Sequence, residues 1–241
     1  MTNKDSTSPS SSLFHGESLQ VLKTFPENSV DAIVTDPPAG INYKGMDWDD
    51  SKGGRDSWIN WLSQIMAEGL RVLKPGGYAL VWAHPRTSHW TATALENAGF
   101  KICDVVIHIF GDGVPRGQAL NDDGRRKGQW STLKPGSEHW ILCKKPITET
   151  DLLNNVKKHG TGVLNIDDCR IPFFEGEKLS TQLNNQGRFP ANVVFSHYDG
   201  CLPNQCTPFC ALPAVLTANT ARYYKVFYCP KATSAERNKG L

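Results

Sequence analysis

The stretch VDAIVTDPP, residues 30–38, decides the fold because it joins a short apolar run to a rigid turn. Residues 30–35 are rich in β-branched side chains, which is typical of a buried parallel strand. The two prolines after Asp36 fix the backbone, so the carboxylate and the carbonyls that follow it are held rigidly at the strand end. Because ligands of α/β sheets bind at the carboxyl ends of strands, Asp36 is predicted to face a functional cleft.

Outward from this stretch, hydrophobic periodicity alternates between strand and helix. A helix is expected over residues 58–73, with Asp56 or Ser57 as N-cap and Pro75-Gly76-Gly77 as the stop. The other expected elements are strands at 78–83, 101–110 and 138–145 and a helix at 87–98. This order predicts an α/β fold with a doubly wound sheet and right-handed crossovers.

The length of 241 residues suits one α/β core with a smaller appendage. We expect a disordered N-terminus at 1–12, the α/β core at 13–146 and an irregular segment at 147–241, where periodicity weakens and Gly, Asn and Pro recur. A polar stretch, residues 111–136, interrupts the core before its last strand and is a candidate functional insertion.

Composition limits the function classes only loosely. The net charge of +2 neither requires nor excludes a nucleic-acid partner, so any such claim depends on local residues. The N-terminus lacks an apolar core of signal-peptide length, and no later stretch suits a membrane span, so a cytoplasmic protein is expected. Cys103, Cys143 and Cys169 are scattered through ordinary α/β sequence and are expected to be reduced.

Rigid acceptors at a strand end suit an amine nucleophile. The exocyclic amino group of adenine or cytosine is a poor nucleophile because its lone pair is delocalised into the ring. If the Asp36 carboxylate and the Pro37 carbonyl each accept one amino hydrogen, the nitrogen is drawn toward tetrahedral geometry and its lone pair becomes available. The alternative is that Asp36-Pro37-Pro38 forms only a rigid turn.

Further motifs accompany this turn. They are FHGESL at 14–19, RVLKPGGY at 71–78, EHWIL at 138–142, GVLNIDDCR at 162–170, GRFPANV at 187–193 and FYCPKA at 227–232. Together they strongly resemble the DNA amino-methyltransferases whose catalytic motif precedes the motif for S-adenosylmethionine (AdoMet). The resemblance implies a Rossmann-like AdoMet-methyltransferase sheet, DNA as partner, AdoMet as cofactor, and Asp36, Pro37, Pro38 and Ala39 at the reaction centre.

The resemblance further implies a phage or restriction-modification enzyme, with adenine favoured over cytosine by family frequency alone. One alternative is a non-enzymatic remnant or DNA-binding module. Another is an RNA or protein amide methyltransferase, against which the length of the match argues.

The chain departs from the family pattern directly after the two prolines. Ala39 stands where the family usually has an aromatic residue that stacks on the flipped base, an interaction worth roughly 1–3 kcal/mol. Tyr43 and Trp48 are candidate replacements, although both would be equally ordinary as anchors of the loop.

A second departure concerns the cofactor. In the family, a segment like Glu236-Arg237-Asn238 is followed by a Lys-Pro helix and a strand with a Gly-rich turn, which form the principal AdoMet cradle. These 241 residues contain no equivalent, and Gly76-Gly77 precedes a strand where such a turn should follow one. We therefore expect an incomplete sheet, weak or no AdoMet binding by the chain alone, and a second polypeptide that supplies the cradle.

Gly16-Glu17 falls where the family often places an acidic residue near the adenine of the cofactor. An equally good interpretation is that Glu17 belongs to the start of a helix, where acidic residues are common.

Basic residues gather in the 111–136 stretch around Trp130, and the topology brings this stretch to the same sheet edge as Asp36. They fit phosphate contacts and base stacking on DNA, while Asp122 and Asp123 leave open a merely solvated loop. The residues concerned are Arg116, Arg125, Arg126, Lys127 and Lys134.

His197, Cys201, Cys206 and Cys210 form the pattern His-x3-Cys-x4-Cys-x3-Cys, which can close a tetrahedral zinc site and order an irregular segment. The usual Cys-x2-Cys knuckle is missing, so ordinary reduced cysteines are the alternative.

Overall fold

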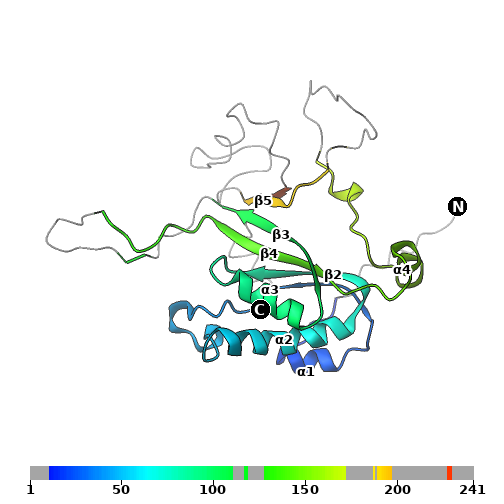
Figure 1. Ribbon diagram of the computed structural model, residues 1–241, viewed down its shortest axis with the longest axis horizontal. Coiled ribbons are helices and arrows are strands. Elements are labelled where there is room, and N and C mark those ends of the chain that lie inside the picture. The colour runs from blue at the N-terminus through cyan, green and yellow to red at the C-terminus, as the bar shows by residue number, and fades with distance from the viewer. Residues whose placement is uncertain are drawn as a thin grey trace, which may run out of the picture.

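The computed structural model describes residues 11–110, 117–118, 128–171, 187 and 189–196, together with the backbone of 227–229 (Figure 1). Its helices are α1 (Ser18–Lys23), α2 (Arg55–Val72), α3 (Ser88–Asn97) and α4 (Leu152–His159), with short 3-10 helices at Tyr43–Gly45, Asp47–Asp49 and Asp167–Cys169. Its strands are β1 (Val30–Thr35), β2 (Leu73–Ala83), β3 (Lys101–Ile109), β4 (Ser137–Lys144), β5 (Val193–Ser196) and β6 (Phe227–Cys229).

The strands form one sheet in the order β1-β2-β4-β3-β5-β6. β4 lies antiparallel between β2 and β3, while the β1–β2, β3–β5 and β5–β6 pairs are parallel. β3 and β4 are adjacent and antiparallel, so residues 110–136 connect them as a hairpin whose loop is longer than the pairing requires. The α/β, Rossmann-like sheet expected from the sequence is confirmed, with β1 at its edge.

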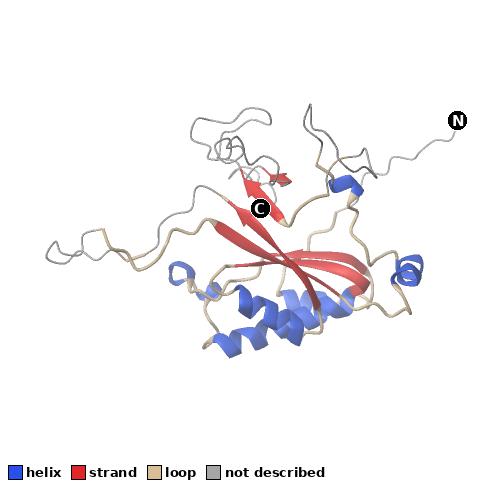
Figure 2. Cartoon of the chain, turned by 45° about the horizontal axis from the view of Figure 1, so that its top comes forward, coloured by secondary structure: helices blue, strands red, loops and turns tan. Residues whose placement is uncertain are grey.

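Helices α1, α2 and α3 lie on one side of the sheet (Figure 2). The chain moves in the same direction across the sheet from β1 to β2 and from β2 to β3. Because both crossovers have the same handedness, their helices α2 and α3 lie on the same face. The expected double winding is therefore wrong for the described part of the chain, where α2 and α3 cover a single face.

Two element boundaries differ from expectation. α2 begins at Arg55 after Gly54, so neither Asp56 nor Ser57 is the N-cap. β2 begins at Leu73, five residues before the expected Tyr78. Pro75-Gly76-Gly77 continues the strand because Gly76 N–H donates to the Lys145 carbonyl (3.1 Å) and Lys145 N–H donates to the Gly77 carbonyl (3.0 Å).

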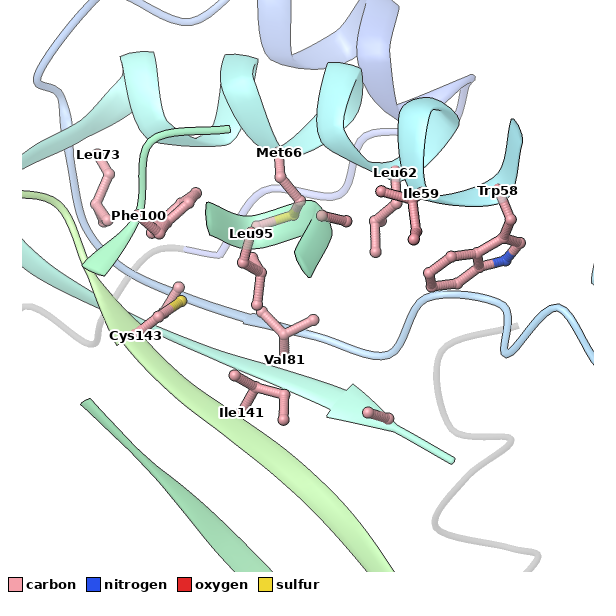
Figure 3. Packing of buried hydrophobic residues seen from close by; sticks show 13 residues of the cluster. Trp58, Ile59, Leu62, Met66, Leu73, Val81, Leu95, Phe100, Ile141 and Cys143 are labelled. Atoms are coloured by element: carbon pink, nitrogen blue, oxygen red, sulfur yellow. The ribbon is translucent and has the colours of Figure 1, made fainter. Parts of the chain in front are cut away.

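The hydrophobic core lies between α2, α3 and one face of the sheet (Figure 3). Trp58, Leu62 and Met66 recur at helical spacing on α2 and are all buried. Opposite them are alternate residues of the strands, namely Ala79, Val81 and Ala83 of β2 and Ile141 and Cys143 of β4. Burial raises the pKa of the Cys143 thiol to about 12, so this thiol stays protonated at neutral pH. Cys103, Cys143 and Cys169 are free, as expected.

The opposite face of the sheet presents a second set of apolar side chains. Val34 on β1 is 71% exposed, and Leu80, Trp82, Trp140 and Leu142 are half-buried. Strands of a parallel sheet are usually covered on both faces. The described helices leave this face and the outer edge of β1 open. No helix of the described residues is long and apolar enough to cross a membrane.

Helix α4 docks at the start of β2 through a buried asparagine. Asn155, 0% exposed, donates from Nδ2 to the Pro75 carbonyl (2.8 Å) and to the Thr161 carbonyl (2.9 Å). Its Oδ1 accepts from Thr148 N–H (3.3 Å). A Cβ at Gly76 would lie 2.7 Å from Asn155 Nδ2, so the glycine allows this close approach.

Asn155→Ala should lower the free energy of unfolding by about 1–3 kcal/mol, because it leaves buried backbone groups without partners. Urea denaturation followed by circular dichroism measures the loss. Asn154→Ala is the matched control, since the Asn154 side chain bonds only within the exposed start of α4, and its effect should stay within about 0.5 kcal/mol. Equal stabilities of the two variants would contradict the docking role of Asn155.

Candidate active site

Asp36 directly follows β1, which runs parallel to β2 with Thr35 opposite Val81. β3 ends and β4 begins at the same edge of the sheet, with His108 paired to Glu138. The parallel β1–β2 pair therefore brings Asp36 to the edge that carries these two side chains and the start of the 110–136 connection. This is the location expected for the DPP stretch.

The backbone after Asp36 is fixed from two sides. The Thr87 hydroxyl donates to the Ala39 carbonyl (3.0 Å). The buried Asp49 carboxylate accepts from Gly40 N–H at Oδ1 (2.9 Å) and from Tyr43 N–H at Oδ2 (2.8 Å). Ala39 and Gly40 are buried and the prolines are half-buried, whereas Asp36 is exposed. The exposed Asp36 carboxylate is thus carried by an anchored backbone.

Two effects perturb the Asp36 carboxyl. Desolvation by the surrounding protein raises its pKa above the ordinary value, and the negative charge of Glu138 raises the pKa further. Both effects favour the protonated acid, so the carboxylate is more basic than that of an ordinary aspartate. A more basic carboxylate is a better acceptor for an amino hydrogen.

Three polar side chains near Asp36 form a connected network that was not predicted from the sequence. His108 Nε2 lies 2.5 Å from Ser196 Oγ, and His108 Nδ1 lies 3.5 Å from Glu138 Oε2. The three residues come from β3, β5 and β4, so only the strand order brings them together. The available signal was the position of Glu138 at the start of an expected strand at the edge that carries Asp36.

The structure also places Tyr43 and Trp48 together, in the loop that follows the turn. Their ring centroids are 6.4 Å apart, Trp48 is 56% exposed, and Lys44 Nζ lies 5.3 Å from the Tyr43 ring centroid. An aromatic pair with one exposed ring, beside a cation, is a surface that can bind a base or a phosphate.

Glu17 caps helix α1, where its carboxylate accepts from Gln20 N–H (3.0 Å). The end of α1 is tied to the last turn of α2 by Arg71, whose Nη2 donates to the carbonyls of Leu22 and Phe25. That turn leads into the start of β2, so the end of α1 lies toward the sheet edge opposite Asp36. Among the described contacts, none joins Gly16 or Glu17 to the Asp36 turn.

Other predicted site residues are placed only in part. Trp130 is 57% exposed in the described part of the connection before β4. Arg116, Arg125, Arg126 and Lys127 lie outside the described residues, as do the zinc candidates His197, Cys201, Cys206 and Cys210. Within the described ranges, no group of three or more His, Cys, Asp and Glu side chains is arranged to hold a metal.

The described residues do not form a cradle for AdoMet. Gly76 and Gly77 lie inside β2, and a Cβ at either would meet Asn155, Gly162, Leu73 or Asp31. These glycines are needed for packing and leave no open backbone for a ligand to approach. No Gly-rich turn follows a strand in the part of the chain that the structure describes.

The raised pKa of Asp36 predicts a pH-dependent gain from Asp36→Asn. Folded Asp36 binds its proton more tightly than the unfolded carboxyl, so its ionisation weakens folding as pH rises above 3.8, the ordinary value. D36N should therefore be more stable than the wild type at pH 7, and the difference should disappear as pH falls below 3.8. Urea denaturation across this range measures it.

Glu138→Gln provides the control for that experiment. In the E138Q background the stabilising effect of D36N at pH 7 should be smaller, because one of the two causes of the shift is gone. A D36N effect that is independent of pH would show that the Asp36 pKa is not raised.

Comparison with known proteins finds similarity over the part of the chain that contains this turn. Residues 30–123, which include the turn, match the family model described as DNA methylase. The type II methyltransferase M.HindIII of Haemophilus influenzae is 25% identical over 200 residues, covering 64% of each chain. The DNA adenine methyltransferase YhdJ of Escherichia coli is 41% identical over 69 residues, 27% of this chain and 22% of its own.

Solved structures with weaker overall likeness include the cytosine-N4-specific PvuII DNA methyltransferase. It has a TM-score of 0.40 and 18% identity, with 62% of this chain and 54% of that chain covered. The M1.HpyAVI–SAM complex has a TM-score of 0.36 and 18% identity, with 56% of each chain covered.

The chain spans 64% of M.HindIII and a smaller share of the other curated relatives, such as 53% of M.HpaI of Haemophilus parainfluenzae. The match over residues 30–123 nevertheless contains the Asp36 turn, the loop that follows it, and α2, β2, α3 and β3. This part of the chain, residues 30–123, is similar to the DNA methylase family.

Proposed function

We propose that this chain carries the catalytic half of a DNA methyltransferase that methylates the exocyclic amino group of adenine or cytosine. The observation that carries the proposal is the Asp36–Ala39 turn. Its one exposed carboxylate stands at the carboxyl edge of the sheet on a backbone anchored by Thr87 and Asp49. This turn lies within the span that matches the DNA methylase family.

The turn acts on the amino group by accepting hydrogen bonds. The Asp36 carboxylate takes one amino hydrogen and the Pro37 carbonyl takes the other, which draws the nitrogen out of conjugation with the ring. Because the acceptors are fixed before the base arrives, little reorganisation is needed when positive charge develops on the nitrogen. AdoMet would supply the methyl group when bound and leave as the thioether, and the Asp36 carboxylate would accept the proton that the methylated nitrogen gives up.

A flipped base also needs a surface to stack on, and Ala39 offers none. Tyr43 and Trp48 are the proposed substitute, because their rings lie together in the loop directly after the turn. Trp130 and the basic residues of the 111–136 stretch are proposed to contact DNA from the same sheet edge. Adenine is the proposed target and phage or restriction-modification the proposed context, with M.HindIII as a type II relative.

The AdoMet cradle is proposed to dock on the open side of the sheet. β1 has an unpaired outer edge in the described sheet, and Val34 is 71% exposed beside it. An edge strand with free N–H and C=O groups accepts a further strand, and the half-buried face around Leu80 and Trp82 accepts a covering layer. We propose that a segment with a Gly-rich turn supplies both.

The rest of the chain is proposed to support this half. Residues 13–146 would form the catalytic core, and residues 147–241 an attached segment that contacts it through α4 and β5. Zinc bound by His197, Cys201, Cys206 and Cys210 remains a proposal, supported by the spacing of these residues in the sequence.

Asp36→Ala should abolish methylation while the fold stays intact, since the side chain is exposed and outside the core. The assay follows transfer of labelled methyl groups to DNA by the chain co-produced with the polypeptide encoded next to it. Circular dichroism checks the fold, and Asp47→Asn, an exposed change in the next loop, serves as the active control. Normal methylation by D36A would overturn the proposed role of Asp36.

The chain of 241 residues alone should bind AdoMet weakly or not at all, because it lacks the backbone donors of a Gly-rich turn. Calorimetric titration of AdoMet into the purified chain gives the affinity. Micromolar binding without any partner would show that other residues of this chain form the cradle.

A further inference from the structure

A buried carboxylate underlies the loop of residues 39–49. Asp49 is 1% exposed, and each of its oxygens accepts one backbone N–H, from Gly40 (2.9 Å) and from Tyr43 (2.8 Å). The Asp49 carbonyl accepts a third, from Asn42 (2.8 Å). In the described part of the chain, backbone amides alone meet this charge, and no ion pair does. Burying a carboxylate is costly unless hydrogen bonds or an ion pair compensate for the lost water.

The loop needs such support because its backbone is strained. Asn42 and Lys44 have φ values of 55° and 51°, in the left-handed region that residues with a Cβ rarely adopt. Gly40 has a φ of 68°, and a Cβ there would lie 2.6 Å from the Trp58 indole. Conformations of this kind persist only when surrounding contacts determine them. The bonds of Asp49 fall on or beside each of these positions.

Thr87 holds the other end of the loop. It is the N-cap residue of α3 and 3% exposed, yet its side chain makes no capping bond. Its hydroxyl donates instead to the Ala39 carbonyl (3.0 Å). Ala39, Gly40 and Tyr43 are therefore anchored by two buried side chains, one from the loop itself and one from α3.

These anchors lie between the two parts of the proposed reaction centre. The Asp36 turn is on one side of Gly40, and the Tyr43–Trp48 aromatic pair is on the other. Their relative position depends on the backbone that Asp49 binds. A displacement of about 1 Å in a reacting group can cost roughly 10²-fold in rate.

We propose that Asp49 is a positioning residue for amino methylation, which fixes the Asp36 turn relative to the base-stacking pair through the amides of Gly40 and Tyr43. This inference rests on the proposed function. Both oxygens are required, because an asparagine would turn an NH2 group toward one of the two N–H donors. Asp49→Asn should thus release one end of the loop without changing the size of the side chain.

The first measurement needs no activity. Hydrogen exchange followed by mass spectrometry on the chain alone should show faster exchange in residues 39–49 of D49N, by at least about fivefold, because one buried bond is lost. Exchange in β2 should not change. Asp47→Asn, two residues away and exposed, should exchange like the wild type. Unchanged exchange in D49N would overturn the proposal.

The second measurement separates positioning from mere stability. In the co-produced system, D49N should lower kcat by roughly 10²-fold and leave KM for AdoMet near the wild-type value. Thr87→Val removes the hydroxyl at similar volume and should lower kcat in the same way, while Thr87→Ser should restore it. If D49N does not fold, the Thr87 variants still test whether anchoring of this loop controls kcat.

The outcomes distinguish the two proposals. If D36A methylates normally, the proposed function fails whatever D49N does. If D36A is inactive but D49N has a faster-exchanging loop and a normal kcat, the positioning role of Asp49 is overturned and the proposed function stands.

Discussion

The parallel pairing of β1 with β2 is the constraint on which the site depends. It sets Thr35 opposite Val81 and so delivers Asp36 to the sheet edge where β3 ends and β4 begins. The pairing is held by the core on one face, where α2 packs against β2 through Trp58, Leu62 and Met66. Pro37 and Pro38 then end the strand, because neither has an N–H to donate to the neighbouring strand. Their rings also fix the backbone, so the acceptors at this strand end are held in place.

Local patterns in the sequence were sufficient to predict β1 and the turn that follows it. The apolar run of residues 30–35 stops at a proline pair, and both the strand bounds and the exposed Asp36 follow from that pattern. The insertion of β4 between β2 and β3 was not predictable in this way, because strand order depends on pairing between distant residues. For the same reason the contacts of His108 with Glu138 and Ser196 could not be predicted, since the three residues come from three strands.

Asp49 shows a further limit of local patterns. It lies among Asp47 and Asp50 in a polar loop and has the appearance of one more solvated acid, yet it is 1% exposed. Its burial follows from the left-handed turns at Asn42 and Lys44, which bring the loop back over its own carboxylate. Glu17 is the opposite case, since helix capping accounts for its carboxylate without any ligand.

The asymmetry of the sheet links the fold to the proposed activity. In the described part of the chain, α2 and α3 cover one face, and the other leaves Leu80, Trp82, Trp140 and Leu142 half-buried beside the unpaired edge of β1. The described residues thus hold the Asp36 turn and its supports, together with a surface suited to a covering layer. In the proposed function, the acceptors of this turn bind the hydrogens of an exocyclic amino group.

The most direct measurement identifies the product. The gene and its neighbours are expressed in a bacterial host without DNA methylation of its own, and the nucleosides of the host DNA are separated and weighed by mass spectrometry. The account predicts N6-methyladenine or N4-methylcytosine. 5-Methylcytosine, in which the methyl group is on carbon, would contradict it.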